Sequence, residues 1–83
     1  MDNLYSLLEN DRLNLLELLL EKNIIKNNEI NTLFLESYKY SLDIVEILVN
    51  YGTDVSRYGQ QVLEKAGTYN NQEVIDYLQE ILN

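Results

Sequence analysis

The chain has 83 residues, of which 46% are hydrophobic, enough for one small domain with a thin core, and this length excludes a two-domain enzyme. The chain has six Lys and Arg residues and fourteen Asp and Glu residues, so its net charge is -8 and its surface as a whole should repel nucleic-acid backbones. Cys and His are absent, which removes disulfides, thiol nucleophiles, the usual zinc ligands and the histidine partner of a catalytic serine. We therefore expect a protein that is not an enzyme and has no cofactor or metal.

The ends and breaks of the chain predict one continuous domain over residues 1–83 in the cytoplasm. Asp2 stands where a secretory signal would carry Lys or Arg. The richest apolar run, Leu13 to Leu20, is far shorter than the roughly 20 residues that cross a bilayer. Proline is absent and the three glycines lie in the second half, so no linker divides the chain.

Apolar residues recur at helical spacing along the chain, which predicts six short helices and no well-supported strand. Residues typical of helix N-caps mark where five of the helices should begin: Asn3, Asp11, Asn31, Ser41 and Asn70. Glu73 is spaced to complete a capping box on Asn70. Gly52 and Asn23 follow the fourth and second helices and are expected to end them, because Gly and Asn adopt the left-handed cap conformation most readily.

A pattern of apolar, apolar, acidic, apolar and Leu residues occurs three times, beginning at Leu15, Ile44 and Val74, at offsets of 29 and then 30 residues. The helices upstream align under the same offsets. Each unit therefore has the form helix, tight turn, helix, over approximately residues 3–31, 32–61 and 62–83. A unit of this size cannot bury its apolar face alone, so we expect three stacked pairs forming a small all-α solenoid. An unrelated antiparallel helical bundle is the alternative.

Residues 42–55, Leu-Asp-Ile-Val-Glu-Ile-Leu-Val-Asn-Tyr-Gly-Thr-Asp-Val, resemble the second helix and exit turn of an ankyrin repeat, whose pattern is close to L-E-I-V-x-L-L-L-x-x-G-A-D-V. The resemblance extends more weakly over the other two units. The T-P-L-H-x-A signature of the first ankyrin helix is reduced to residues 31–36, with Glu36 in the place of Ala. The period is also shorter than the usual one of about 33 residues. The resemblance implies degenerate ankyrin-like repeats with truncated or missing β-hairpin fingers.

Acidic residues occupy equivalent positions on the second, fourth and sixth predicted helices: Glu17, Glu21, Asp43, Glu46, Glu73, Asp76 and Glu80. Stacked helices run about 8 to 10 Å apart, so these positions should merge into one acidic face on the outer, convex side. This face is either a solvated surface that keeps the stack soluble, or a docking surface for a basic protein. In the second case the face could imitate a nucleic-acid backbone and occupy the phosphate-binding groove of that protein. A metal site built from the same carboxylates is disfavoured, because no EF-hand calcium loop is present.

Tyrosine accounts for seven of the eight aromatic residues and is enriched at protein interfaces. In ankyrin repeats the residues near the end of the first helix face the concave groove. A second set of equivalent positions in successive repeats also faces this groove, and the resemblance places Phe34 and Tyr5 there. The residues predicted to contact a partner on the concave face are Tyr38, Lys39, Tyr40 and Tyr69. Tyr5, Tyr51 and Tyr77 are the ones expected to pack between repeats with their hydroxyls in water.

The predicted function is that of a small acidic protein-interaction module that binds and occludes a basic, nucleic-acid-handling protein. Such a module would be an inhibitor, for example a viral antagonist of a nucleic-acid-directed defence enzyme or an immunity protein against a toxin. Direct binding to nucleic acid or to a membrane is not expected. The alternative is a structural subunit that forms homodimers or larger assemblies through apolar residues of its end repeats: Leu4, Leu7, Leu8, Tyr77, Ile81 and Leu82.

Overall fold

The computed structural model describes residues 4–82, and every regular element in this range is helical. The elements are α1 (Tyr5–Glu9), α2 (Leu13–Glu21), α3 (Asn27–Glu36), the 3-10 turn η1 (Ser37–Lys39), α4 (Leu42–Asn50), α5 (Val55–Tyr69) and α6 (Gln72–Leu82). The prediction of an all-α chain is confirmed. The turn η1 continues α3 without a break, so the chain between α3 and α4 is tighter than a simple loop.

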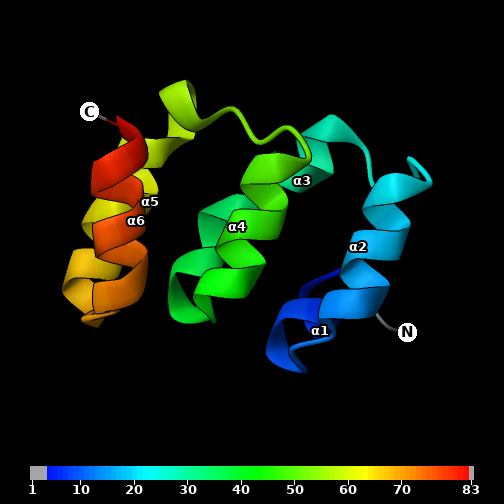
Figure 1. Cartoon of the computed structure of the whole chain (residues 1–83), viewed down its shortest axis with the longest axis horizontal. Coiled ribbons are helices and arrows are strands. Elements are labelled where there is room, and N and C mark those ends of the chain that lie inside the picture. Colours follow the sequence, from blue (N-terminus) through cyan, green and yellow to red (C-terminus); the bar gives the residue numbers. More distant parts are fainter. Residues whose placement is uncertain (1–3, 83) are drawn as a thin grey trace.

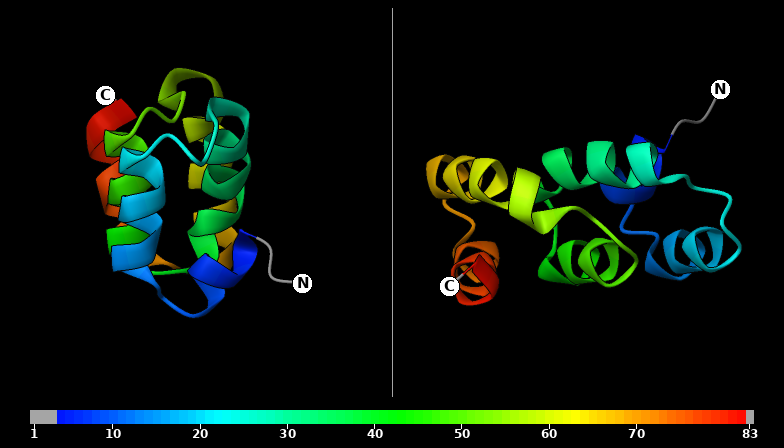
Figure 2. Two further views of the ribbon diagram at one scale, coloured as in Figure 1. Left: turned by 90° about the vertical axis from the view of Figure 1, so that its right-hand side faces the viewer. Right: turned by 90° about the horizontal axis from the view of Figure 1, so that it is seen from above.

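Consecutive helices form three pairs, α1 with α2, α3 with α4, and α5 with α6, which lie side by side along the longest of the 32 × 22 × 18 Å dimensions (Figure 1). Seen from above, α1, α3 and α5 form one layer, and α2, α4 and α6 form the other (Figure 2). The helices α2 and α4 have equal lengths of 9 residues. Their first residues, Leu13 and Leu42, reproduce the spacing found in the sequence.

Four helices end at a residue with positive φ: Asp11 (52°), Asn23 (58°), Gly52 (114°) and Asn70 (67°). After α2, the N–H of Asn23 donates to the carbonyl of Leu20 at 3.1 Å and the N–H of Ile24 to that of Leu19 at 3.0 Å. The same two bonds recur in the other three turns, and together they form the Schellman arrangement that satisfies the last carbonyls of a helix. The predicted roles of Gly52 and Asn23 are confirmed.

The predicted N-caps Asp11 and Asn70 are wrong, because these residues end α1 and α5 and do not begin the next helix. Asp and Asn suit both a helix start and a left-handed turn, and the connections here are so short that the two positions are adjacent. The helix α6 begins at Gln72, so Glu73 completes no capping box on Asn70. Ser41 does occupy the N-cap of α4, but its hydroxyl donates to Asp11 Oδ1 at 3.3 Å. Asn3 lies outside the described residues.

The predicted start of the third helix at Asn31 is also wrong, because α3 begins at Asn27. The Glu29 carboxylate caps this earlier start by accepting a 2.8 Å hydrogen bond from the N–H of Lys26. Asn31 instead lies inside α3, where its side-chain oxygen accepts a 2.9 Å hydrogen bond from the N–H of Asp54. Asp54 is the N-cap of α5 and accepts from the N–H of Arg57 at 3.2 Å. The bond between Asn31 and Asp54 therefore ties α3 to the start of α5.

The core lies between the two layers and is built from Leu, Ile and Val of all six α-helices and of the turn after α2, together with Phe34 and Ala66. Phe34 has no exposed surface, so its expected position in the groove is wrong. Because α3 starts early, Ile30, Leu33 and Phe34 fall on one helical face at spacings of three and four residues, and this face is buried. Tyr5, expected in the same set of positions as Phe34, remains 38% exposed at the end of the molecule.

Candidate protein-binding surfaces

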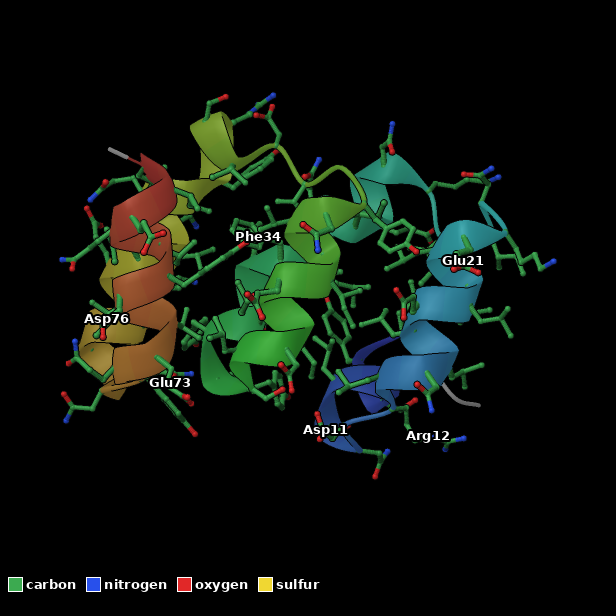
Figure 3. The ribbon with its side chains drawn as sticks, viewed as in Figure 1. Asp11, Arg12, Glu21, Phe34, Glu73 and Asp76 are labelled. Carbon is green, nitrogen blue, oxygen red and sulfur yellow. The ribbon has the colours of Figure 1, made fainter. Side chains whose placement is uncertain are left out.

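The first candidate surface, which we call the acidic face, is the outer side of the layer formed by α2, α4 and α6. These helices contain seven of the fourteen acidic residues and none of the six basic ones, so they account for seven of the eight excess negative charges. Six of the seven side chains are exposed and Glu46 is half-buried. Figure 3 shows Glu21 on α2 and Glu73 and Asp76 on α6, in the layer that faces the viewer. The structure thus brings the predicted acidic residues onto one layer: Glu17, Glu21, Asp43, Glu46, Glu73, Asp76 and Glu80.

Three carboxylates of the acidic face accept hydrogen bonds from neutral side chains. The Tyr51 hydroxyl lies between two of them, 3.4 Å from Glu21 Oε1 and 3.5 Å from Glu17 Oε2. On α6, the Gln72 amide donates to Asp76 Oδ1 at 2.8 Å. Among residues 4–82 the one ion pair joins Lys39 to Glu36 at 3.2 Å, and it belongs to the other layer. The negative charge of the acidic face is therefore not compensated within the described chain.

Two tyrosines carry their hydroxyls next to this charge, as expected for side chains that pack between helix pairs. Burial raises the pKa of Tyr51 above its ordinary value, and the negative charges of Glu21 and Glu17 raise it further. Burial likewise raises the pKa of Tyr77, and Glu46 adds to the effect. Each tyrosine comes from a later helix pair than the carboxylates it approaches. The neutral phenol therefore joins neighbouring pairs without cancelling any charge of the acidic face.

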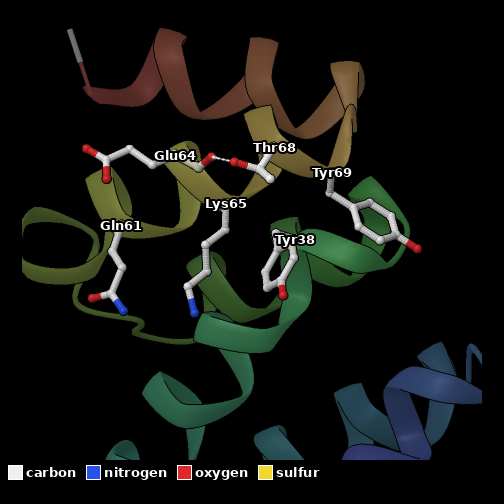
Figure 4. A pocket seen from close by; sticks show the side chains of 6 residues that line it. All are labelled: Tyr38, Gln61, Glu64, Lys65, Thr68 and Tyr69. Carbon is white, nitrogen blue, oxygen red and sulfur yellow. Dashed lines mark hydrogen bonds between the residues drawn. The ribbon is translucent and has the colours of Figure 1, made fainter.

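The second candidate surface, which we call the tyrosine groove, lies where η1 meets α5 in the other layer (Figure 4). Its volume is about 440 Å³, and its lining residues are Tyr38, Gln61, Glu64, Lys65, Thr68 and Tyr69. The rings of Tyr38 and Tyr69 meet edge to face, with centroids 5.9 Å apart and an interplanar angle of 82°. The Lys65 ammonium lies 5.7 Å from the centroid of the Tyr38 ring. The groove thus combines aromatic surface with a cation.

Of the four residues predicted for the concave face, the structure brings Tyr38 and Tyr69 together in the groove. Lys39 lies beside them, 5.6 Å from the Tyr38 centroid, but it pairs with Glu36, whose hydrogen bond raises the pKa of Lys39. Tyr40 does not line the groove and packs against the core instead.

The resemblance to ankyrin repeats places Thr68 of α5 in the groove as well as Tyr69, but the sequence interpretation missed Gln61, Glu64 and Lys65 of the same helix. Gln61, Lys65 and Thr68 follow one another at spacings of four and three residues and therefore share a side of α5. Figure 4 shows Gln61 and Lys65 extending to the same side of that helix, while the Glu64 side chain points away from them. Once Tyr69 is assigned to a groove, this spacing is the signal that could have identified them.

Within the described range, no group of three or more Asp or Glu side chains is arranged to hold a metal ion. None of the described helices is long and apolar enough to cross a membrane.

Comparison with known proteins relates the chain to proteins of a large virus. The chain is 33% identical over 79 residues to uncharacterized protein L697 of Acanthamoeba polyphaga mimivirus, an alignment that covers 93% of this chain and 21% of that protein. It is 41% identical over 64 residues to uncharacterized protein L172 of the same virus, covering 75% and 16% respectively. The chain thus spans about a fifth, or less, of the length of these relatives. No family model matches the chain, and no solved structure is significantly similar to it.

Proposed function

We propose that this chain is a protein-binding module that docks its acidic face on a basic protein and covers a nucleic-acid-binding site there. The observation that carries the proposal is the separation of charge: seven carboxylates share one layer that contains no Lys or Arg. A partner with a basic surface would supply the cations that these three helices lack. Complementary charges of this kind steer association and select the partner.

The acidic face suits the imitation of a nucleic-acid backbone because its charges are held on packed helices. A protein that binds nucleic acid presents Lys and Arg to regularly spaced phosphates, and a rigid row of carboxylates can occupy the same groove. Similarity to mimivirus proteins supports a viral setting, in which the partner is a nucleic-acid-directed defence enzyme in the cytoplasm of the host. An immunity protein against a toxic nuclease would use the same chemistry.

We further propose that the three helix pairs are short ankyrin-like repeats of a solenoid. The equal lengths and regular spacing of α2 and α4, and the matching turns at Asn23 and Gly52, support this interpretation. A solenoid tolerates the insertion of a unit because each repeat contacts only its neighbours. Inserting a second copy of residues 26–54 after residue 54 should therefore give a folded, longer helical protein. Loss of cooperative unfolding in the enlarged chain would favour a closed helical bundle.

The docking proposal is tested with two double variants that remove equal charge from different parts of the molecule. Asp43→Asn with Glu80→Gln changes the acidic face at two exposed carboxylates. Glu9→Gln with Asp11→Asn changes two exposed carboxylates, in α1 and in the turn that follows it, outside both candidate surfaces. Each protein is used to capture partners from a lysate of the native host, with elution by rising salt. The captured protein is then assayed for nucleic-acid binding with and without the module.

We expect the wild type and the variant with Glu9→Gln and Asp11→Asn to retain one basic protein and to displace nucleic acid from it. The acidic-face variant should bind it more weakly and associate more slowly, with a flatter dependence on salt. Equal binding by both double variants would show that net charge alone, and not the acidic face, drives the association. A captured protein that keeps its nucleic acid would contradict occlusion.

The tyrosine groove is proposed as a second contact for the same partner. Tyr69 is 56% exposed and is therefore available to a partner, whereas Tyr38 is half-buried beneath it. Aromatic anchors of an interface commonly contribute about 2 kcal/mol or more to binding. Tyr69→Ala should weaken capture by this amount, and Tyr5→Ala, an exposed tyrosine at the far end of the molecule, is the control. Equal effects of the two variants would exclude the groove.

A further inference from the structure

The tyrosine groove contains two hydrogen-bond donors that have no partner in the described part of the chain. Lys65 forms no ion pair there, although its ammonium lies 5.7 Å from the centroid of the Tyr38 ring. The amide of Gln61, one helical turn before Lys65, likewise forms no hydrogen bond within the described range. The Thr68 hydroxyl is already engaged, because it donates to the carbonyl of Glu64 at 3.3 Å. The free donors of the groove are therefore Lys65 and Gln61, on the same side of α5 (Figure 4).

The charges around the groove favour an anion over a cation. Glu64 is the one carboxylate among the six lining residues, and its side chain points away from Lys65 (Figure 4). A second ammonium, that of Lys39, lies 5.6 Å from the centroid of the same Tyr38 ring. Lys39 is balanced by its ion pair with Glu36, whereas Lys65 is not balanced. A Lys or Arg side chain of a partner would be repelled at this point, and a carboxylate would be attracted.

The aromatic surface of the groove requires an occupant larger than a free anion. Tyr69 is 56% exposed, and Tyr38 meets it edge to face and is half-buried. A small anion would leave this surface in water, and a single exposed ammonium holds such an ion weakly. A peptide with an aliphatic or aromatic side chain beside its carboxylate would cover Tyr69 and contact Lys65 together.

The positions of the two candidate surfaces indicate which part of a partner reaches the groove. The acidic face is the outer side of the layer formed by α2, α4 and α6, and the groove lies in the other layer, where η1 meets α5. A basic surface docked on the acidic face lies against the first layer. The groove must then be filled by a separate segment of the same partner.

We infer that the tyrosine groove binds an extended acidic segment of the partner protein, in which an Asp or Glu adjoins an apolar residue. The carboxylate accepts hydrogen bonds from Lys65 and Gln61, and the apolar side chain packs on Tyr69. This inference rests on the groove contact proposed above and names its occupant. It does not depend on docking of the acidic face.

The test is a titration of the whole chain with synthetic peptides, followed by amide NMR. The probes are blocked hexapeptides in which Asp or Glu adjoins Tyr, Trp or Leu. Each has two matched peptides, one with Asn or Gln and one with Lys in place of the acid. We expect the acidic peptides to bind about threefold to tenfold more tightly than their amide counterparts, as for an exposed charge-assisted contact. The Lys peptides should bind most weakly, and the shifts should be confined to η1 and α5.

Two variants separate the charge of the groove from its aromatic surface. Lys65→Gln should remove the preference for the acidic peptides and leave binding of the amide peptides nearly unchanged. Tyr69→Ala should weaken the binding of both kinds. Lys22→Gln makes the same change in net charge at an exposed lysine after α2, far from the groove in sequence, and is the control. It should bind as the wild type does.

Several results would overturn the inference. They are the absence of shifts with any peptide at millimolar concentration, equal affinity for the three kinds of peptide, tightest binding by the Lys peptides, and an unchanged preference in Lys65→Gln. Tighter binding of inorganic phosphate or a single-stranded oligonucleotide in the groove would assign it to another ligand. Self-association that Lys65→Gln abolishes, measured by sedimentation, would assign it to a second copy of the chain.

Failure of this inference is distinguishable from failure of the docking proposal, because the peptides are titrated with no partner present. A chain that binds no acidic peptide but captures a basic protein through its acidic face would lose only the groove ligand. A chain that binds the acidic peptides but captures no basic protein would lose only the docking proposal.

Discussion

The side-chain amide of Asn71 donates a hydrogen bond to the carbonyl oxygen of Tyr38, at 2.9 Å, across 33 residues of sequence. The same nitrogen is 2.9 Å from the carbonyl oxygen of Tyr40. Asn71 lies in the turn between α5 and α6, and both carbonyls belong to the turn that joins α3 to α4. One amide thus satisfies two carbonyls of the second pair and fixes the third pair against it, directly beside the tyrosine groove.

We predict that Asn71→Ala destabilises the fold by about 1 to 3 kcal/mol, because the two part-buried carbonyls lose their donor. Asn71→Asp should destabilise at least as much, since a carboxylate would face the two carbonyl oxygens. Urea denaturation measures the change, and Asn28→Ala, at an exposed position of α3, is the control. A loss below about 0.5 kcal/mol for both Asn71 variants would mean that water replaces the amide without penalty.

Two glycines should respond in opposite directions to the same substitution. Gly52 has a φ of 114°, so Gly52→Ala should destabilise by about 1 kcal/mol or more even though no atom lies within 4 Å of the new Cβ. Gly67 lies in α5 with the same open space, and Gly67→Ala should stabilise by about 0.4 to 1 kcal/mol. Thermal unfolding of both variants is the measurement. Changes of the same sign would contradict the assignment of Gly52 to a left-handed turn.

The sequence predicts the helices of this fold better than their ends. Apolar residues recur with the helical period within each helix because one face of the helix is buried, and this spacing is visible in a single sequence. Asp and Asn favour both the start of a helix and the left-handed turn that ends the helix before it, so their presence does not distinguish the two positions. The sequence therefore assigns Asp11 and Asn70 to the start of the wrong helix, whereas Gly52 suits only the end of a helix.

The two candidate surfaces also differ in how far the sequence predicts them. The acidic face could be predicted because its residues repeat with the pairs. The groove could be predicted only in part, since Lys65 and Gln61 meet Tyr38 through the packing of α5 on η1. The bonds of Asn71 to Tyr38 and Tyr40 join residues more than 30 positions apart and have no local signal.

Stability should fall at alkaline pH because of the tyrosines beside the acidic face. The pKa of Tyr51 in the fold is raised above the ordinary value of 10.0, so the unfolded chain loses this proton first as the pH rises. The stabilisation that the neutral phenol provides is complete below pH 10 and is lost as the pH rises through the raised pKa of the fold. Tyr77 contributes in the same direction.

We predict that Tyr51→Phe flattens this alkaline loss in urea denaturation measured at several pH values. Glu21→Gln should lower the pKa of Tyr51, because it removes one of the repelling charges; the ultraviolet absorbance of tyrosinate reports the change. Tyr69→Phe removes an exposed tyrosine of the other layer and is the control. An alkaline loss that is unchanged in Tyr51→Phe would show that other groups cause it.

The acidic face should reduce the stability of the helices that carry it. Asp76 and Glu80 are four residues apart on α6, so they are neighbours of like charge in the last turns of a helix, where the backbone dipole favours cations. Glu80→Lys replaces repulsion with an attraction to Asp76 and places a cation near the C-terminus. We expect it to stabilise the fold by about 0.5 to 1 kcal/mol, measured by urea denaturation at low salt.

The control, Glu64→Lys, makes the same change in net charge at an exposed position of α5 that has no charged residue three or four positions away. It should leave stability nearly unchanged. Capture of the partner should be weakened by Glu80→Lys and retained by Glu9→Lys, which makes the same change in net charge at an exposed position outside both candidate surfaces. If the acidic face served only to keep the protein soluble, a substitution that stabilises the fold would not be expected to weaken binding. A Glu80→Lys protein that is more stable and binds as well as the wild type would therefore remove α6 from the docking surface.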